Sequence, residues 1–273
     1  MSAKIPEEIL CQLKKRGITI HRANPDDFLL FPSSLSQPNK EKFYHKLKRY
    51  SFRLFVRDMI KRKEKFSPKE LTHYCSLSTA RLYIKFLEQI EVIKEIKRGY
   101  YKLVVDTSSF GSTLEWFLSQ VYIKEFCSPA IYGVRFKDIP SGGDFDVISS
   151  WLGNLIYTEA KASPPKGIEI NEVNAFFKRI DELLPDVALF VNDTQLRMKD
   201  KIVFLFEEGL KKRFGEVKAK DYKVARLKDE LFHINHHIFI VNSHRDLIKN
   251  IMICLKDFFR NFRLWKVENQ FKK

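Results

Sequence analysis

The sequence predicts an α/β protein whose main unit has the order helix, three strands, helix, strand, preceded by a mainly helical unit. Helical spacing of apolar residues is found over residues 42–63, 113–125 and 171–184. Short apolar runs typical of strands are found at residues 131–136, 144–150, 155–162 and 187–192. Hydrophobic residues make up 44% of the chain, which is enough for a folded core.

Residues 1–41 are expected to form an N-terminal extension and a linker. A short helix is predicted over residues 5–16, since acidic residues at its start and basic residues at its end suit the helix dipole. Residues 18–21 and 28–31 are short apolar stretches that suit strands, and the polar residues 33–39 suit a linker.

Residues 42–106 predict a second unit of three helices and a hairpin. A basic helix is expected over residues 42–63. The next helix should begin at Ser67, because Ser67-Pro68-Lys69-Glu70 has the pattern of a capping box with proline at the first helical position. Ser78 is expected to cap the third helix, and Gly99 lies in a turn between two β-rich runs.

This order of elements resembles a winged helix-turn-helix domain. In that family the third helix enters the major groove and the hairpin contacts the nucleic-acid backbone. The resemblance implies nucleic-acid contacts at Ser78, Thr79, Arg81, Lys85, Lys97 and Arg98. For the residues of the third helix, a solvated helix face with a capping role for Ser78 is the alternative interpretation.

Residues 107–273 predict the α/β unit, which is separated from the preceding one by a polar break at residues 107–111. Gly153-Asn154 is a typical hairpin turn between two strands. The strand at 187–192 shows no alternation, as expected for a buried central strand. A further helix, a buried strand and a closing helix are expected over residues 198–214, 237–242 and 246–262.

Acidic residues and one lysine are predicted to converge on two of these strands. Side chains alternate along a strand, so Glu159 and Lys161 share one face, and Asp144 and Asp146 share a face of the preceding strand. Clustered carboxylates repel one another unless a cation lies between them, and their hard oxygens suit Mg²⁺ or Mn²⁺. A lysine beside such a metal could orient a water for attack on a phosphodiester.

Asp146 and Glu159-Ala160-Lys161, inside the predicted α-β-β-β-α-β order, resemble the PD-(D/E)XK, or restriction-endonuclease-like, nuclease superfamily. The resemblance implies that Asp146 and Glu159 ligate metal and that Lys161 is the catalytic lysine. It also implies that the carbonyl of Ala160 is an extra metal ligand and that Glu115, in the preceding helix, is a further acid. The proline that precedes the first acid in the PD-(D/E)XK motif is absent here, since Phe145 precedes Asp146.

The net charge of +15 comes from 49 Lys and Arg against 34 Asp and Glu and points to a polyanionic partner. Residues 45–105 contain 16 basic and 6 acidic side chains, whereas residues 106–200 contain 9 and 14. The first unit is therefore expected to bind the nucleic acid, and the acidic second unit needs a metal to approach a phosphodiester. A solvated surface rich in Lys and Glu pairs is the alternative interpretation.

The four cysteines, Cys11, Cys75, Cys127 and Cys254, are widely spaced and indicate reduced thiols in a cytoplasmic protein. No apolar run is long enough to span a membrane. His233, His236 and His237 lead into a strand without paired Cys or acidic residues at ligand spacing, which disfavours zinc binding there.

Together these features predict a cytoplasmic, Mg²⁺-dependent endonuclease that acts on double-stranded or branched DNA and is targeted by a winged helix. A homodimer would provide the two sites needed to cut both strands. The alternative is a non-catalytic DNA-binding regulator or accessory subunit with a degenerate nuclease fold.

Overall fold

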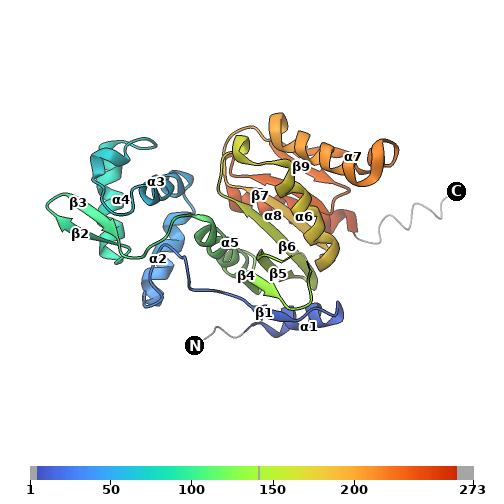
Figure 1. Cartoon of the computed structure of the whole chain (residues 1–273), viewed down its shortest axis with the longest axis horizontal. Coiled ribbons are helices and arrows are strands. Elements are labelled where there is room, and N and C mark those ends of the chain that lie inside the picture. The colour runs from blue at the N-terminus through green and yellow to red at the C-terminus, as the bar shows by residue number, and fades with distance from the viewer. Residues whose placement is uncertain (1–4, 141, 263–273) are drawn as a thin grey trace.

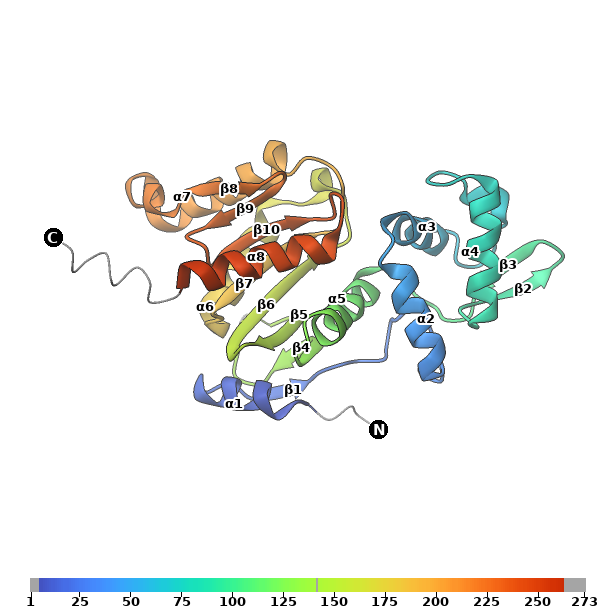
Figure 2. The ribbon, with the colours of Figure 1, turned by 180° about the vertical axis from the view of Figure 1, so that it is seen from behind.

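The computed structural model describes residues 5–140 and 142–262 and is built around a mixed sheet of eight strands (Figures 1 and 2). The strand order is β1-β4-β5-β6-β7-β10-β9-β8. Strands β6, β7 and β10 run parallel, and the other neighbours are antiparallel. The strands are β1 (Ile20–Arg22), β4 (Ala130–Phe136), β5 (Phe145–Trp151), β6 (Asn154–Lys161), β7 (Val187–Asn192), β8 (Val224–Lys228), β9 (Leu231–Ile234) and β10 (Ile238–Asn242).

Helices cover both faces of this sheet. The residues packed under α5 (Gly111–Glu125) and α8 (Leu247–Phe262) include Val147 and Ile156. The opposite face packs against α1 (Glu7–Lys15), α6 (Ile170–Leu183) and α7 (Phe204–Lys218), through residues such as Ile148 and Tyr157. This alternation follows from the period of two along a strand. The predicted order of helix, three strands, helix and strand is confirmed as α5-β4-β5-β6-α6-β7.

The predicted helical unit lies beside the sheet, at the left of Figure 1. It consists of α2 (Gln37–Leu47), α3 (Tyr50–Ile60), the 3₁₀ turn η1 (Pro68–Leu71), α4 (Leu77–Gln89) and the hairpin of β2 (Ile93–Lys97) and β3 (Tyr100–Leu103). The capping box at the start of η1 is confirmed, with Ser67 and Glu70 bonded to each other's backbone.

Two predictions for this unit are wrong. Residues 42–63 form two helices rather than one, because the chain turns at Lys48 and Arg49, where Arg49 is extended. Arg53 donates to the carbonyls of Leu47 (2.6 Å) and Lys48 (3.2 Å), and these bonds satisfy acceptors that a continuous helix would have used. The cap of α4 is Ser76, not Ser78, since the Ser76 hydroxyl accepts from the Thr79 amide at 3.2 Å.

The N-terminal residues form part of the sheet unit. Strand β1 pairs with β4, and Gln12 of α1 donates to the Ser150 hydroxyl of β5 at 2.8 Å. Residues 28–31 form a loop rather than the strand that their apolar character suggested. Phe28 is exposed and residues 29–31 are buried, and the Leu30 amide donates to the Thr113 hydroxyl at 2.9 Å. The expected boundary between residues 41 and 42 falls inside α2.

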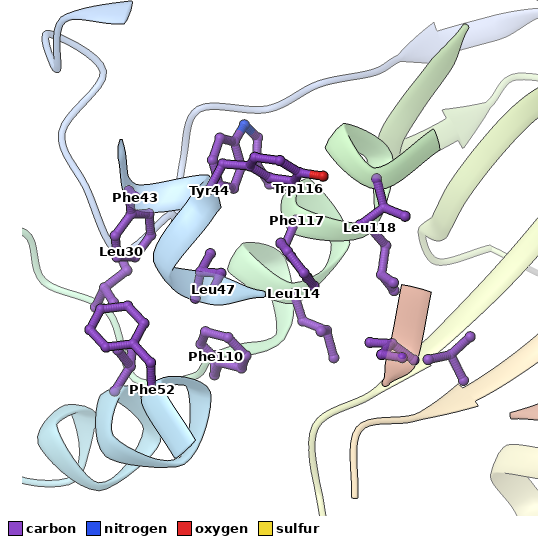
Figure 3. Packing of buried hydrophobic residues seen from close by; sticks show 14 of the residues in the cluster. Leu30, Phe43, Tyr44, Leu47, Phe52, Phe110, Leu114, Trp116, Phe117 and Leu118 are labelled. Carbon is purple, nitrogen blue, oxygen red and sulfur yellow. The ribbon is translucent and has the colours of Figure 1, made fainter. Parts of the chain in front are cut away.

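A continuous aromatic core joins the helical unit to the sheet unit. Figure 3 shows Phe43 and Tyr44 of α2 and Phe52 of α3 in the same cluster as Trp116 and Phe117 of α5. Phe43 stacks on Trp116 with ring centroids 6.2 Å apart. Burial of each such side chain stabilises the fold by about 1.5–3 kcal/mol, so the two units pack as one body here.

At the C-terminal end the predicted strand and closing helix are confirmed as β10 and α8. The helix predicted over residues 198–214 is a π-helical turn at Lys199–Val203 followed by α7, and β8 and β9 were not predicted. Residues 263–273 lie outside the described part of the chain. Within that part, no helix combines the length and apolar character needed to cross a membrane.

Candidate functional site

The register of β5 and β6 brings the two predicted metal-binding acids together. Val147 pairs with Thr158, so the neighbouring Asp146 and Glu159 lie opposite each other, on the face covered by α6. The Ala160 amide donates to Asp146 Oδ2 at 2.7 Å. Alternation along the strands and the hairpin turn were therefore sufficient to predict this pairing.

Glu159 is the centre of a buried polar network. Its side chain is about 2% exposed and accepts from Arg179 Nη1 at 3.1 Å (Oε1) and 2.9 Å (Oε2). The Tyr157 hydroxyl also donates to Glu159. The ammonium of Lys161 lies 2.9 Å from Glu159 Oε1 and 3.1 Å from Glu172 Oε1. Such charge-assisted bonds fix the direction of the Glu159 carboxylate.

Lys161 is held as an ammonium ion. Burial alone would lower its pKa, but the charges of Glu159 and Asp146 and the hydrogen bond to Glu172 raise the pKa above the ordinary value. At neutral pH this side chain can therefore donate hydrogen bonds and positive charge but cannot take up a proton.

Glu115 reaches the same region from α5. Burial, followed by the charges of Asp144 and Glu159, raises the pKa of Glu115 to about 7. The Glu115 carboxylate lies close to Gly133 of β4, which has a φ of +54°. A Cβ added at Gly133 would lie 3.7 Å from Glu115 Oε2 and 2.8 Å from the Pro25 ring. A Cβ at position 133 would collide with the Pro25 ring and would lie in ordinary contact with the Glu115 carboxylate.

The acids carry more negative charge than their surroundings neutralise. The pKa of Asp146 is raised well above its usual range by burial and by the charges of Glu159 and Glu115. A divalent cation would relieve this repulsion, and carboxylate oxygens are ligands that Mg²⁺ and Mn²⁺ accept. The donor set thus fits the implied metal.

The carboxylates are spaced more widely than a preformed three-acid site would be. In the described ranges, Glu115, Asp146 and Glu159 do not bring three ligand atoms within 4.8 Å of one another. A metal would accordingly be held by two of these acids, with other oxygens completing its shell, or would draw the three together.

Asp144, the alternative first acid, lies at the margin of the site. It accepts from Arg135, with Nη2 at 3.4 Å from Oδ2, and Arg22 is 3.9 Å away. Its side chain is about 35% exposed and paired with Arg135, whereas Asp146 accepts from the Ala160 amide opposite Glu159. Asp146 is thus the acid that faces the Glu159–Lys161 pair.

Arg179 is the main residue of the site that was not predicted as part of the acidic cluster. From the sequence, Lys178 and Arg179, in the helix after β6, suit either contacts with a substrate backbone or a solvated helix face. The Arg179 guanidinium lies between Glu159 and the glycine loop, where an added Cβ on Gly143 would be 3.1 Å from Nη2. Arg179 follows the buried Phe176 by three residues on α6, and this spacing is the sequence signal that places Arg179 on the buried face of the helix.

The predicted nucleic-acid contacts divide into two groups. Arg81 and Lys85 of α4 and Arg98 of the hairpin tip line one groove of about 670 Å³ between α4, η1 and β3, together with Lys69. We call this the basic groove. Ser78, Thr79 and Lys97 are not among its lining residues. Ser78 and Thr79 bond to the Ser76 hydroxyl (2.8 and 3.0 Å), and the Lys97 ammonium lies 4.6 Å from the centre of the Tyr100 ring.

A buried ion-pair cluster connects α3 to the end of β7. Arg53 donates to both oxygens of Asp193 at 2.9 and 2.8 Å, and Arg57 and Ser243 also donate to this carboxylate. Burial alone would raise the pKa of Asp193, but the two arginines lower it to about 2. The Asp193 amide donates to the Lys161 carbonyl at 2.8 Å, so the cluster is bonded directly to the lysine's strand.

No protein-family model and no curated protein matches the chain. Among solved structures, the chain is similar to protein VC1899 from Vibrio cholerae, with 16% identity and a TM-score of 0.43 over 70% of this chain and 53% of the other. It is also similar to Can2 from Sulfobacillus thermosulfidooxidans in complex with cyclic tetra-adenylate (cA4), with 12% identity and a TM-score of 0.45 over 92% and 60%. The chain thus spans less than two thirds of the length of either protein, and both likenesses are distant.

Proposed function

We propose that this chain is a metal-dependent endonuclease that hydrolyses phosphodiester bonds in DNA. The observation that carries the proposal is the arrangement of Asp146 and Glu159 opposite each other on paired strands, with the Lys161 ammonium 2.9 Å from Glu159. The pKa values of Asp146 and Glu115 are raised first by burial and then by the charges of neighbouring acids, and a cation between the acids would remove that second, repulsive contribution.

In this mechanism each polar side chain has a separate task. Asp146, Glu159 and the Ala160 carbonyl would hold Mg²⁺ or Mn²⁺, which supplies Lewis acidity at the phosphorus centre and favours ionisation of water. Lys161, as an ammonium, donates to the attacking water or to a phosphoryl oxygen and stabilises the charge that develops there. Arg179 and Tyr157 position the Glu159 carboxylate through the bonds described above.

The basic groove supports nucleic acid as the partner of the helical unit. Arg81, Lys85 and Arg98 converge there from a helix and a hairpin tip, as binding by a winged helix requires. Contacts of these side chains with phosphates would release counterions, so the affinity should fall as salt rises.

Replacing Arg98 by alanine should weaken DNA binding at every sequence tested. Loss of one phosphate contact is expected to reduce the slope of log affinity against log salt by about 1. Fluorescence anisotropy at several salt concentrations measures both quantities. Lys14→Ala, at an exposed lysine of α1, is the matched control and should leave affinity and slope unchanged. Equal slopes for Arg98→Ala and the wild type would contradict the claim that the basic groove contacts DNA phosphates.

Cleavage assays with Mg²⁺, Mn²⁺ and EDTA test the nuclease proposal directly. Linear duplex, branched DNA, single-stranded DNA and RNA should be incubated with the full chain and resolved on denaturing gels. We expect cleavage of duplex or branched DNA with a divalent metal only, and none by Asp146→Asn. Absence of cleavage with every metal and substrate would contradict the proposal.

One observation favours the non-catalytic alternative. Glu159 already has two cationic partners, Arg179 and Lys161, so its charge is compensated without a metal. A DNA-binding regulator or accessory subunit with a degenerate site would bind DNA equally well in EDTA and cleave it under no condition. The same assays therefore separate the two functions.

A further inference from the structure

A second group of ligand-type side chains lies between the β9–β10 turn and α8, elements that are neighbours in Figure 2. It consists of His233 on β9, His236 in the turn and Asp257 on α8, with one ligand atom from each within 4.8 Å of the others. His236 Nδ1 is 2.6 Å from Asp257 Oδ2, and the two imidazole rings are 4.0 Å apart. We call these residues the His–Asp cluster.

The backbone of the turn brings the two imidazoles together. The His237 amide donates to the Ile234 carbonyl at 3.1 Å, and the central residues Asn235 and His236 have φ values of 49° and 59°. This is the geometry of a type I′ turn, whose second central position favours glycine. Histidine occupies that position at a steric cost, and its side chain thereby lies against His233.

Asp257 is oriented by its own helix. The Asn261 amide group donates to Asp257 Oδ1 at 3.2 Å and to the Asp257 carbonyl at 2.9 Å. Oδ2 is consequently directed to His236, and the carboxylate is only about 16% exposed. A carboxylate fixed by a neighbouring donor is the usual arrangement around a bound metal.

The His–Asp cluster is separate from the proposed nuclease site. In the sheet, β9 is separated from β6 by β7 and β10. The neighbouring residues Leu231 and Phe239 pack in the core under α8, whereas Glu159 faces α6. The two sites therefore lie on opposite faces of the sheet.

We propose that His233, His236 and Asp257 form a transition-metal site of the Zn²⁺ class. Two imidazole nitrogens and one carboxylate suit a borderline ion rather than Mg²⁺, and three protein ligands leave a position for water. Ligand atoms around tetrahedral zinc are about 3.3 Å apart, so the distance of 2.6 Å between His236 Nδ1 and Asp257 Oδ2 would lengthen as the ion enters. The ion replaces the proton shared by His236 and Asp257, which passes to solvent.

The site is tested by adding Zn²⁺ to the EDTA-treated and dialysed full chain in calorimetric titrations. We expect one equivalent to be lost in each of His233→Gln, His236→Gln and Asp257→Asn. His73→Gln, at an exposed histidine of the helical unit, is the matched control and should keep it. Full retention of this equivalent in the three cluster variants, or its loss in His73→Gln, would overturn the proposal.

A milder variant keeps the test valid if a ligand substitution unfolds the chain. Asn261→Ala leaves all three ligands in place and should weaken Zn²⁺ binding by about 10–100-fold. Cobalt(II) supplies a second readout, since N and O ligands give visible d–d bands without a thiolate charge-transfer band. A thiolate band would assign the ion to cysteine and contradict the proposal, as would unchanged affinity in Asn261→Ala together with absent d–d bands.

Discussion

Lys161→Met is expected to lower the rate of DNA cleavage by about 10²-fold or more while leaving DNA affinity unchanged. Methionine keeps much of the length and the apolar stem of lysine but removes the ammonium that lies 2.9 Å from Glu159. Loss of one preorganised donor to a developing charge typically costs a factor of this size. Single-turnover cleavage at saturating Mg²⁺, compared with anisotropy in EDTA, measures the two effects separately.

The control for this substitution is Lys166→Met. Lys166 is an exposed lysine in the turn that follows β6, so its loss should change neither cleavage nor stability measurably. Because Arg179 still neutralises Glu159, Lys161→Met is expected to fold. Cleavage by Lys161→Met at the wild-type rate would show that the lysine has no part in the chemistry.

The paired strands of the site were predictable because their signals are local. Alternation places Asp146 and Glu159 on one face, and Gly153-Asn154 fixes which strands meet. The edge strand β8, of five residues, carries polar residues, so no apolar pattern distinguishes it from a loop, whereas β1, of three residues, overlaps the apolar stretch expected to suit a strand at residues 18–21. β1 pairs with β4, which is distant in sequence, whereas β8 pairs with β9, the next strand along the chain.

The polar networks could not be predicted because their members are far apart along the chain. Arg53 and Asp193 are separated by 140 positions, and nothing near either residue indicates the partner. His233 and His236 were visible as a group, but the acid that completes it, Asp257, follows 21 residues after His236 on another element. Long-range charge pairs of this kind also set the pKa values, which depend on burial that only the fold establishes.

Asp193→Ala should produce the largest loss of stability among the substitutions considered. Arg53 is about 1% exposed, and without Asp193 its guanidinium would remain buried with no carboxylate partner. Removal of one member of a buried ion pair typically lowers the free energy of unfolding by about 3–5 kcal/mol. Urea unfolding followed by circular dichroism measures the loss.

The matched control is Arg213→Ala, which breaks the exposed ion pair between Arg213 and Asp181. Exposed pairs contribute about 0–1 kcal/mol, so this variant should unfold close to the wild type. A loss below about 1 kcal/mol for Asp193→Ala would mean that water reaches Arg53 and that α3 is not fixed to β7 through this cluster.

The loss of folding stability at low pH provides an independent test of the same cluster. The pKa of Asp193 is lowered from 3.8 to about 2, so the folded state holds this carboxylate ionised where the unfolded chain would protonate it. The resulting stabilisation is complete above about pH 4 and is lost as the pH falls toward 2. Asp193→Ala should therefore show a shallower decline of stability between pH 4 and 2 than the wild type. Because the Asp193 amide also donates to the Lys161 carbonyl, the same cluster joins α3 to the end of β6.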